Sequence, residues 1–312
     1  MATLATGACG SDQGQSGSAP TTPSTTAING TGPADGYTPV SDVSTHAAIG
    51  RDAAEMRTLM EPAKSGGVVD WAATAKIFAE GKYSKKDGGL RTLATLAPED
   101  AVTSLLRDAV SGAGTATGAS DAIRRQKVDK AITVILERKV LGELQAAVKK
   151  TRDGKTDAAT GAPHNVDEAW AFYTAEGQGP ASTAAKRAAD FKKEGKVHEA
   201  VLAALVEAQG AAKTGDVSKL GTAIEGAEAA LDYVFYLATF KYLDTKGDPV
   251  TRAEGETFYL GIQPEVTKAA ADSDKAISGA FASGQARTGR AALNSTAVLT
   301  ALGITQEERI SE

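Results

Sequence analysis

From about residue 41 onwards, the apolar residues of this 312-residue chain recur at intervals of three and four. This spacing places them along one side of an α-helix, and no stretch alternates apolar and polar residues for long enough to indicate a strand. Aromatic residues make up only 5% of the chain, so its core must consist mainly of Ala, Val and Leu. The pattern predicts an all-α, Ala-rich bundle of about ten helices.

Residues that favour helix starts and stops give limits for these helices. Asp70 precedes one apolar periodic segment and either Ser120 or Asp121 opens another, all of them typical N-cap residues, and Asn165 with Glu168 resembles a capping box. The predicted helices span residues 41–60, 71–80, 99–111, 120–152, 166–176, 181–194, 196–213, 216–244, 249–261, 264–283 and 289–302. Residues 41–312 are therefore expected to form a single helical domain.

Two segments of this domain are weakly alike. Val69-Asp70-Trp71, which leads to Glu80-Gly81, resembles Val166-Asp167-Glu168, which leads to Glu176-Gly177. In both, an Asp precedes a helix that carries a Trp and ends in Glu-Gly. The likeness is compatible with a duplicated helical unit and equally with chance similarity between Ala-rich helices.

Residues 1–40 differ in composition from the rest of the chain. They contain four of the ten prolines, many Ser, Thr and Gly residues, and only two charged residues, Asp12 and Asp35. Such a segment has too little apolar surface to offset the conformational entropy lost on ordering. Residues 1–40 are therefore predicted to be a disordered tether.

The single cysteine, Cys9, lies near the start of this tether. The small residues before it and Gly-Ser-Asp after it resemble a bacterial lipoprotein processing site, although Thr6 stands where Leu is usual. The charged and apolar parts of a signal peptide do not precede Cys9, so this interpretation expects a start site further upstream. Cys9 is predicted to carry a lipid anchor, and the alternative is a free cysteine in a flexible tail.

Composition and motifs exclude several classes of function. With 34 basic and 39 acidic residues, the chain has a net charge of -5, which argues against tracking a nucleic-acid backbone. No apolar run approaches the roughly 20 residues of a membrane-spanning helix. One cysteine excludes disulfide frameworks and thiolate zinc sites. The HExxH zinc motif, the GxSxG nucleophile motif and the phosphate-binding loop are absent, so no sequence feature indicates an enzyme.

Four short stretches place acids, tyrosines or a histidine in an apolar helical context. Asp232 stands among neighbours such as Leu231 and Phe235, where a lone carboxylate is costly unless it is paired, hydrogen-bonded or bound to a metal. Tyrosines lie three residues from acids in two other stretches, which places each pair on one helix face. The candidate metal ligands are His46, Tyr173, Glu176, Asp232, Tyr236, Glu256 and Tyr259.

Carboxylate and phenolate oxygens with at most one imidazole suit a hard cation, and ferric iron fits best because phenolate stabilises it. Calcium is disfavoured because the chain has no Asp-rich calcium loop. The same residues also have structural interpretations. His46 can be a packed core histidine, and Asp232 can form a salt bridge or hydrogen bond to a neighbouring helix.

Four segments, in order along the chain, carry a family resemblance: Ser44–Ile49, Phe78–Leu93, Val166–Tyr173 and Ala253–Tyr259. They resemble the algal iron-assimilation family, whose members are called Fe-assimilating or low-iron-inducible periplasmic proteins and have bacterial relatives. The resemblance extends from about residue 40 to residue 303. It implies an extracytoplasmic, iron-responsive protein that binds or concentrates iron near the cell surface, and it does not itself identify ligands. The cysteines of a secreted eukaryotic relative are absent, so no disulfide is carried over.

The sequence thus predicts a surface-tethered helical protein that captures iron in a helix-lined cleft and hands it to an uptake system or membrane transporter. No nucleic acid is expected as a partner, and contact with a membrane is expected only through the lipid anchor. The main alternative is a metal-free structural or partner-binding helical lipoprotein. A third is an imelysin-type iron-uptake lipoprotein, but its His-x-x-Glu motif is absent: Ile49, Asp167 and Val201 follow the three histidines.

Overall fold

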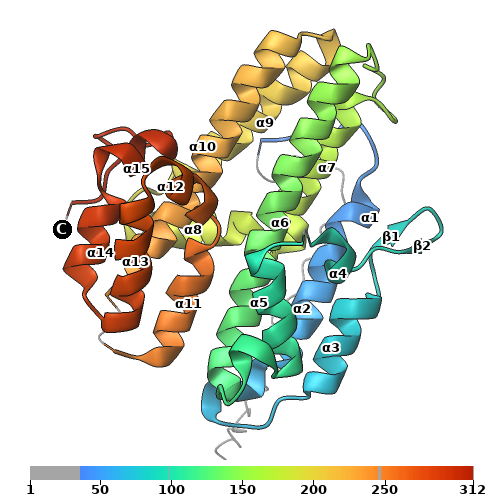
Figure 1. Ribbon diagram of the computed structural model, residues 1–312. Helices are drawn as coiled ribbons and strands as arrows, with labels where there is room; N and C mark the ends of the chain where they lie inside the picture. The colour runs from blue at the N-terminus through green and yellow to red at the C-terminus, as the bar shows by residue number, and fades with distance from the viewer. Residues whose placement is uncertain (1–35, 98, 245–246, 312) are drawn as a thin grey trace, which may run out of the picture. The chain divides into compact units, whose positions relative to one another are not determined.

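Most of the described residues are helical, which confirms the predicted all-α class. A computed structural model describes residues 36–97, 99–244 and 247–311. All of them belong to one compact unit of the chain. Figure 1 shows how their helices are arranged.

The helices vary widely in length. The first part of the chain contains α1 (Ser44–Ala47), α2 (Ile49–Leu59), α3 (Trp71–Glu80), α4 (Leu93–Leu96), α5 (Ala101–Ser111), α6 (Asp121–Arg152) and α7 (Ala162–Thr174). The second part contains α8 (Pro180–Asp190), α9 (Val197–Thr214), α10 (Val217–Tyr242), α11 (Pro249–Tyr259), α12 (Gln263–Ala269), α13 (Ala271–Ser283), α14 (Ala286–Leu293) and α15 (Thr296–Ala301). Short 3-10 helices lie at Glu61–Ser65 (η1), Gly114–Ala116 (η2) and Ala175–Gly177 (η3).

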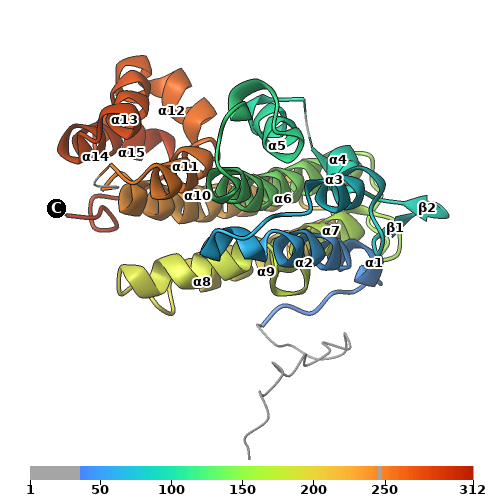
Figure 2. The same cartoon turned by 90° about the horizontal axis from the view of Figure 1, so that it is seen from below.

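The two long helices α6 and α10 lie at the centre of the arrangement. α6 packs against α5, α7, α10 and α11, and α10 packs against α9 and α11. In Figure 2, α6 and α10 lie between α2 and α8 on one side and α5, α12 and α13 on the other. Both helices are therefore covered on more than one face.

The core consists largely of aliphatic side chains, as the low aromatic content requires. Along α6, Val128, Ile132, Leu136, Val140 and Leu144 are buried, which confirms the predicted apolar face of this helix. Further α6 positions between them are buried as well. Small side chains allow these helices to approach closely, which suits a core that is poor in aromatic residues.

N-cap residues explain where several helices begin. Asp70 accepts a hydrogen bond from the backbone N–H of Ala73 at 2.9 Å, which confirms this predicted cap. Of the two candidates at the start of α6, Ser120 is the N-cap and Asp121 is the first helical residue. The predicted capping box of Asn165 and Glu168 is wrong. α7 begins earlier, at Ala162, with a proline in its first turn, so both side chains lie inside the helix.

Three predicted helices are divided in the structure. The helix predicted at 41–60 is α1 and α2, which are separated at Ala48. The helix predicted at 264–283 is α12 and α13, which meet at Ala270 with a φ of -154°. The helix predicted at 289–302 corresponds to α14 and α15, separated at Ser295, whose backbone is extended. Neither of these last two breaks contains Gly or Pro, so periodicity alone does not reveal them.

The structure also contains a β-hairpin that the sequence pattern had not led us to expect. β1 (Lys85–Lys86) pairs antiparallel with β2 (Gly89–Leu90). The turn residues Asp87 and Gly88 have positive φ angles of 51° and 80°. Asp-Gly is a strong signal for such a turn, because both turn positions need left-handed backbone geometry. The hairpin brings β1 next to α1.

The weak internal similarity does not extend to the helix starts. α3 begins directly after Asp70, whereas Asp167 lies inside α7 and is fully buried. The two tryptophans also differ in their contacts. Trp71 donates to Asp121 Oδ1 at 2.8 Å, and Trp170 stacks on an aromatic ring from the N-terminal segment. The two segments therefore have different local structures.

The predicted tether falls mostly at residues 1–35, outside the described residues, and so does the predicted lipidation site Cys9. Residues 36–40 contact the helical body, so the body begins before residue 41. Tyr37 is 1% exposed, and its ring centroid lies 5.5 Å from that of Trp170. Its hydroxyl donates to Asp167 Oδ1 at 2.7 Å.

Gly50 of α2 marks a close approach to the end of α7. A Cβ atom at this position would lie 1.8 Å from the carbonyl oxygen of Ala175. We expect Gly50→Ala to lower the free energy of unfolding by about 2 kcal/mol, because two backbone segments must separate. Chemical denaturation measures the change. Gly142→Ala in α6, where a Cβ meets nothing within 4 Å, is the matched control. Equal stability of the two variants would contradict the close contact.

Candidate functional site

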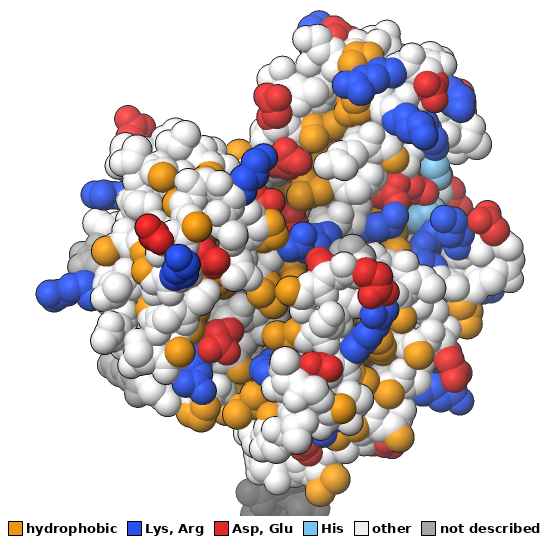
Figure 3. All heavy atoms as spheres, viewed as in Figure 1, with side chains coloured by type: hydrophobic (Ala, Val, Ile, Leu, Met, Phe, Trp, Pro, Cys, Tyr) orange, Lys and Arg blue, Asp and Glu red, His pale blue; other side chains and the backbone are white. Residues whose placement is uncertain are grey.

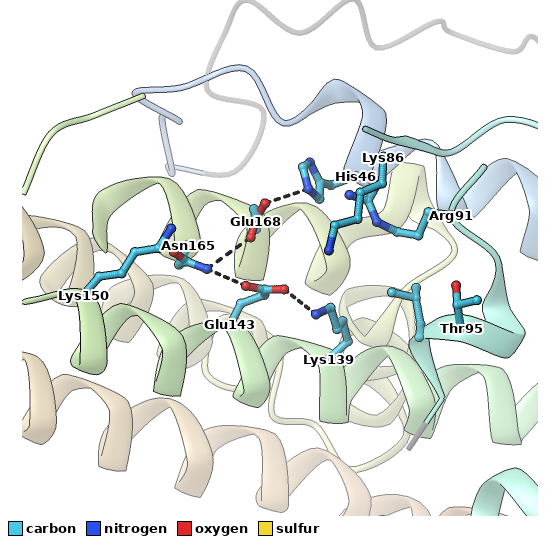
Figure 4. Close-up of a pocket in the computed structure, with 10 residues that line it drawn as sticks. His46, Lys86, Arg91, Thr95, Lys139, Glu143, Lys150, Asn165 and Glu168 are labelled. Atoms are coloured by element: carbon cyan, nitrogen blue, oxygen red, sulfur yellow. Dashed lines mark hydrogen bonds and ion pairs between the residues drawn. The ribbon is translucent and has the colours of Figure 1, made fainter. Parts of the chain in front are cut away.

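A polar cavity of about 380 Å³ lies where α1, α4, α6, α7 and the β-hairpin meet. Figure 4 shows the side chains that surround it. In Figure 3, histidine side chains reach the surface beside acidic and basic ones at the right of the view. The lining residues are His46, Lys86, Arg91, Thr95, Leu96, Lys139, Glu143, Lys150, Asn165 and Glu168. This cavity is called the α6–α7 pocket below.

Glu168 connects two histidines at this pocket. Its Oε1 atom lies 2.7 Å from Nε2 of His46 and 3.2 Å from Nε2 of His164. Its Oε2 atom accepts a hydrogen bond from Asn165 Nδ2 at 3.2 Å. Two imidazole nitrogens and one carboxylate therefore meet at one point, and these are donor types that bind iron.

Helix geometry explains why these groups meet. His164 and Glu168 are four residues apart on α7, so they share one face of that helix. Glu143 faces them from α6 and accepts a hydrogen bond from Asn165 Nδ2 at 2.6 Å. His46 approaches from α1, which packs on α7. α7 therefore supplies His164, Asn165 and Glu168, α6 supplies Glu143 and α1 supplies His46.

The segment before α1 supports the pocket from behind. Ser41 Oγ donates to Asp167 Oδ2 at 2.7 Å and lies 2.8 Å from Nδ1 of His164. Asp167 also accepts hydrogen bonds from the backbone N–H groups of Val40 and Ser41 and from Gln209 Nε2. Asp167 thus fixes Ser41, and Ser41 in turn orients the His164 ring.

The two carboxyl groups of the pocket differ in acidity. Burial acts to raise the pKa of Glu168, but hydrogen bonds from His46 and Glu143 and the nearby histidines lower the pKa to about 2. Burial and the hydrogen bond to Glu168 raise the pKa of Glu143, and Lys139 acts in the opposite direction. Glu168 is therefore the anionic carboxylate, and Glu143 is the group that retains a proton more readily.

The described residues contain no group of three or more His, Cys, Asp or Glu side chains placed so that they could hold a metal ion, so His46, His164 and Glu168 do not form a complete metal site in this structure. An ion in the α6–α7 pocket would therefore need further donors. Other polar atoms there lack partners in the described part of the chain. His46 Nδ1 and Asn165 Oδ1 are both buried without a hydrogen bond. Unpartnered buried polar atoms are uncommon in proteins and call for a ligand or water.

The structure places the seven predicted ligands in different surroundings. His46 lies in the α6–α7 pocket, as described above. Glu176 follows α7 and forms an ion pair with Arg51 at 2.7 Å, with a large part of both side chains in solvent. The remaining predicted ligands are Tyr173 on α7, Asp232 and Tyr236 on α10, and Glu256 and Tyr259 on α11. Figure 1 shows α10 and α11 away from α1.

Two of the predicted tyrosines are engaged as hydrogen-bonding groups. The Tyr173 hydroxyl lies 2.9 Å from Nδ1 of His198, and the two rings are stacked. The Tyr236 hydroxyl donates to Asn294 Oδ1 at 2.7 Å. Burial raises the pKa of Tyr236 to about 12, so its phenol remains protonated near neutral pH.

The α11 pair also has partners of its own. Glu256 lies 3.7 Å from Arg252, one turn away on the same helix. Tyr259 donates to Asp274 Oδ1 at 2.9 Å. Burial, followed by this hydrogen bond, raises the pKa of Tyr259. To coordinate iron, Tyr236 or Tyr259 would have to lose a phenol proton, and the raised pKa of each phenol opposes this loss.

Asp232 lies among other acids. Burial raises its pKa to about 9, and the charges of Glu137 on α6, Glu265 on α12 and Glu228 on α10 add to the effect. Glu137 is 2% exposed, and its Oε2 atom has no hydrogen-bond partner among the described residues. Burial raises the pKa of Glu137 to about 8. The raised pKa favours the uncharged form of Asp232, which avoids the cost of a charged carboxylate in these surroundings.

The sequence pattern indicates only one residue of the pocket lining as a candidate ligand. His46 was identified as a candidate, whereas Glu143, His164 and Glu168 were not. Glu143 is a buried acidic residue of α6 next to the apolar Leu144. An acid in an apolar helical context is the same feature that made Asp232 a candidate. Glu168 was interpreted as part of a helix cap. The signal was therefore present, but it was assigned to local helix structure.

Fold and site together define a class of protein: an all-α protein with a pocket that combines histidine, carboxylate and basic side chains. Residues 16–232 match the family model described as "low iron-inducible periplasmic protein". The chain therefore belongs to the family of low iron-inducible periplasmic proteins. This confirms the resemblance inferred from the sequence and indicates an iron-related role outside the cytoplasm. The matched segment contains every residue that lines the pocket, and Tyr236, Glu256 and Tyr259 lie beyond its end.

No curated protein and no solved structure matches the chain. In the described part of the chain, no helix has both the length and the apolar character needed to cross a membrane. The family match begins before residue 40 and ends well before residue 303. It therefore covers less of the C-terminal part than the resemblance suggested.

Proposed function

We propose that the protein captures iron at the α6–α7 pocket, outside the cytoplasm, and passes it to an uptake system. The family links the chain to low iron and to the periplasm. The observation that carries the proposal is the position of Glu168 between the Nε2 atoms of His46 and His164. No reaction is required of the protein, only binding and release of the ion.

The tautomer of His164 favours this use. Asp167 accepts the hydroxyl proton of Ser41, so Ser41 Oγ is left to accept a hydrogen bond from Nδ1–H of His164. The neutral imidazole then has its lone pair on Nε2, the atom that faces Glu168. A lone pair and a carboxylate oxygen at 3.2 Å repel each other unless a proton or a cation lies between them.

The spacing of these donors suits an octahedral ion. Two ligands at about 2.1 Å from a metal and at right angles to each other are about 3.0 Å apart. The Glu168 oxygen lies 2.7 Å and 3.2 Å from the two histidine nitrogens, close to that value. Binding would displace the protons held between these groups, so acidification favours release.

The proposal includes delivery as well as capture. A lipid on Cys9 would keep the pocket near a membrane, and the segment between Cys9 and Tyr37 would act as the tether. A transporter in that membrane is the expected recipient of the iron. A metal-free, partner-binding surface protein is the alternative, and it predicts no iron-dependent change in any property of the purified chain.

The test is a comparison of two glutamate variants. Glu168→Gln should weaken Fe(III) binding by on the order of 100-fold, because the anionic ligand is lost. Glu176→Gln is the matched control, since Glu176 was also predicted as a ligand but pairs with Arg51 at the surface. Iron per chain, measured by elemental analysis after gel filtration, and iron-induced thermal stabilisation are the readouts. Equal iron binding by both variants would show that Glu168 is not a ligand.

Absorbance spectroscopy separates this site from one built on tyrosines. The α6–α7 pocket has no tyrosine in its lining, so bound Fe(III) should give no tyrosinate-to-iron band in the visible range. A strong band that is lost in Tyr173→Phe, Tyr236→Phe or Tyr259→Phe would move the iron to those residues.

A further inference from the structure

Arg91 is built into the α6–α7 pocket in an unusual way. It is 6% exposed, and its Nη1 atom donates to the carbonyl oxygens of Thr45 and Lys85 and to Ser84 Oγ at 2.9–3.2 Å. These contacts fix the guanidinium between α1 and the hairpin. The Nε and Nη2 atoms have no acceptor among the residues that the structure describes, although Arg91 lines the pocket.

The Nε–Nη2 edge is the part of a guanidinium that grips a carboxylate or phosphate with two parallel hydrogen bonds. Burial normally requires such a charged group to be paired. Burial lowers the pKa of Arg91, whereas the negative charges of Glu168 and Glu143 raise it. An oxyanion in the pocket would complete the hydrogen bonding of this edge.

Other cations line the same pocket. Lys86 is exposed on β1, Lys139 pairs with Glu143, and Lys150 donates to the carbonyl oxygen of Thr160 at 2.7 Å. With Arg91, four basic residues line the cavity, against two carboxyl groups. Figure 4 labels these side chains. The lining therefore carries an excess of two formal positive charges when the histidines are neutral.

A bare Fe(III) ion would be repelled by this lining. An oxyanion bound to the iron removes that repulsion and also supplies the donors that the protein lacks. Asn165 Oδ1, buried and without a partner in the described structure, is available to accept a hydroxyl hydrogen. The cavity volume of about 380 Å³ is in the range of small-molecule sites.

We propose that the α6–α7 pocket takes iron together with a carboxylate or other oxyanion, which Arg91 binds through its Nε–Nη2 edge while His46 and Glu168 contact the metal. The favoured ligand is a hydroxycarboxylate chelate of Fe(III), such as ferric citrate. The proposal rests on the function proposed above, but it assigns the anion to the part of the pocket around Arg91 and Lys86, which we call the anion half. That half can be tested without iron.

The first experiment measures citrate binding to the iron-free protein by calorimetry, at low and high salt. Lys86→Met should weaken citrate binding by about fivefold, the size expected for one partly exposed ion pair. Lys85→Met is the matched control, because Lys85 lies beside Lys86 on β1 but does not line the pocket. Arg91→Lys keeps the positive charge but removes the Nε–Nη2 edge that donates two parallel hydrogen bonds, so it should weaken citrate binding about tenfold or more. Circular dichroism checks that each variant folds.

The second experiment compares iron sources. Fe(III) supplied with citrate should bind more tightly to the wild type than Fe(III) supplied with carbonate or with inorganic phosphate, and Arg91→Lys should remove the difference. If carbonate or phosphate promotes Fe(III) binding as strongly as citrate does, the pocket still has an oxyanion site. Its ligand is then a free anion and not a hydroxycarboxylate chelate. If no oxyanion binds the iron-free chain or promotes iron binding, the proposal is wrong, although iron capture itself can stand. Citrate binding without any iron binding would overturn the proposed function and leave the oxyanion site.

Discussion

Asp232→Asn is expected to stabilise the iron-free protein at pH 8, although it removes an ionisable residue from the middle of the longest C-terminal helix. Asp232 lies among Glu137, Glu228 and Glu265, and burial together with their charges raises its pKa to about 9. The folded protein must therefore hold a proton on this carboxyl group or bear the repulsion. Asparagine has nearly the same shape and carries no charge.

The sign of the pH dependence follows from proton binding. An unfolded chain releases the Asp232 proton above its ordinary pKa of 3.8, whereas the folded protein keeps it up to about pH 9. Between these values the native state binds more protons, so its stability falls as pH rises. Glu137, whose pKa is about 8, adds to this slope. The gain from Asp232→Asn should thus be small near pH 4.5 and reach about 1–3 kcal/mol at pH 8, after allowance for partial solvent access.

Chemical denaturation across this pH range checks the result. Asp272→Asn is the matched control, because the Asp272 side chain is fully exposed, and it should change stability by less than about 0.5 kcal/mol. A loss of stability in Asp232→Asn would show that the carboxylate has a favourable partner in the folded protein. If Fe(III) stabilises the wild type and not this variant, the iron site lies at Asp232 and the pocket assignment fails.

The fold was largely predictable because its information is local. The apolar period along α6 and the N-cap Asp70 depend on residues within a few positions of one another, and the structure confirms both. The breaks at Ala270 and Ser295 were not predictable in this way, since no Gly or Pro interrupts the apolar pattern there. Tertiary packing of short C-terminal helices decides them.

The pocket could be predicted only in part, because its groups come from distant segments. His46 and Asp232 attracted attention as polar residues among apolar neighbours. The sequence could not show that His46 meets Glu168 from another helix, or that Asp232 meets other acids. Arg91 becomes informative only when its burial and its unused hydrogen-bonding edge are known. Such facts depend on how helices pack and not on local spacing.

Asp167→Ala should cause a large loss of stability, about 3–5 kcal/mol, as expected when one partner of a buried charged network is removed. Asp167 is fully buried and accepts hydrogen bonds from Tyr37, Val40, Ser41 and Gln209. Alanine removes the acceptor that these donors share in a buried or partly buried site, and Gln209 Nε2 keeps only its contacts with Tyr37 and Thr38. Burial and the neighbouring carboxylate raise the pKa of Tyr37, so its phenol is a donor in this network.

Truncations separate the contribution of the N-terminal segment from that of Asp167 itself. Removal of residues 1–40 deletes the contacts of Tyr37 and Val40 and should reproduce a substantial part of the loss. Removal of residues 1–35 leaves every described contact in place and should change stability by less than about 1 kcal/mol. Urea denaturation measures all three proteins. Equal stability of the two truncated chains would show that Tyr37 and Val40 contribute nothing.

The same substitution should weaken iron binding, although Asp167 is not expected to touch the ion. Ser41 connects Asp167 to Nδ1 of His164, and His46 follows Ser41 closely in the chain. Loss of Asp167 would release Ser41, allow His164 to change tautomer and loosen the approach of His46 to Glu168. Supporting residues of this kind typically change metal affinity by about 10–100-fold. Asp167→Asn, which keeps an acceptor oxygen, should recover part of the stability but not the tautomer control. Fe(III) affinity that is unchanged in a folded Asp167→Asn protein would show that His164 is not a ligand.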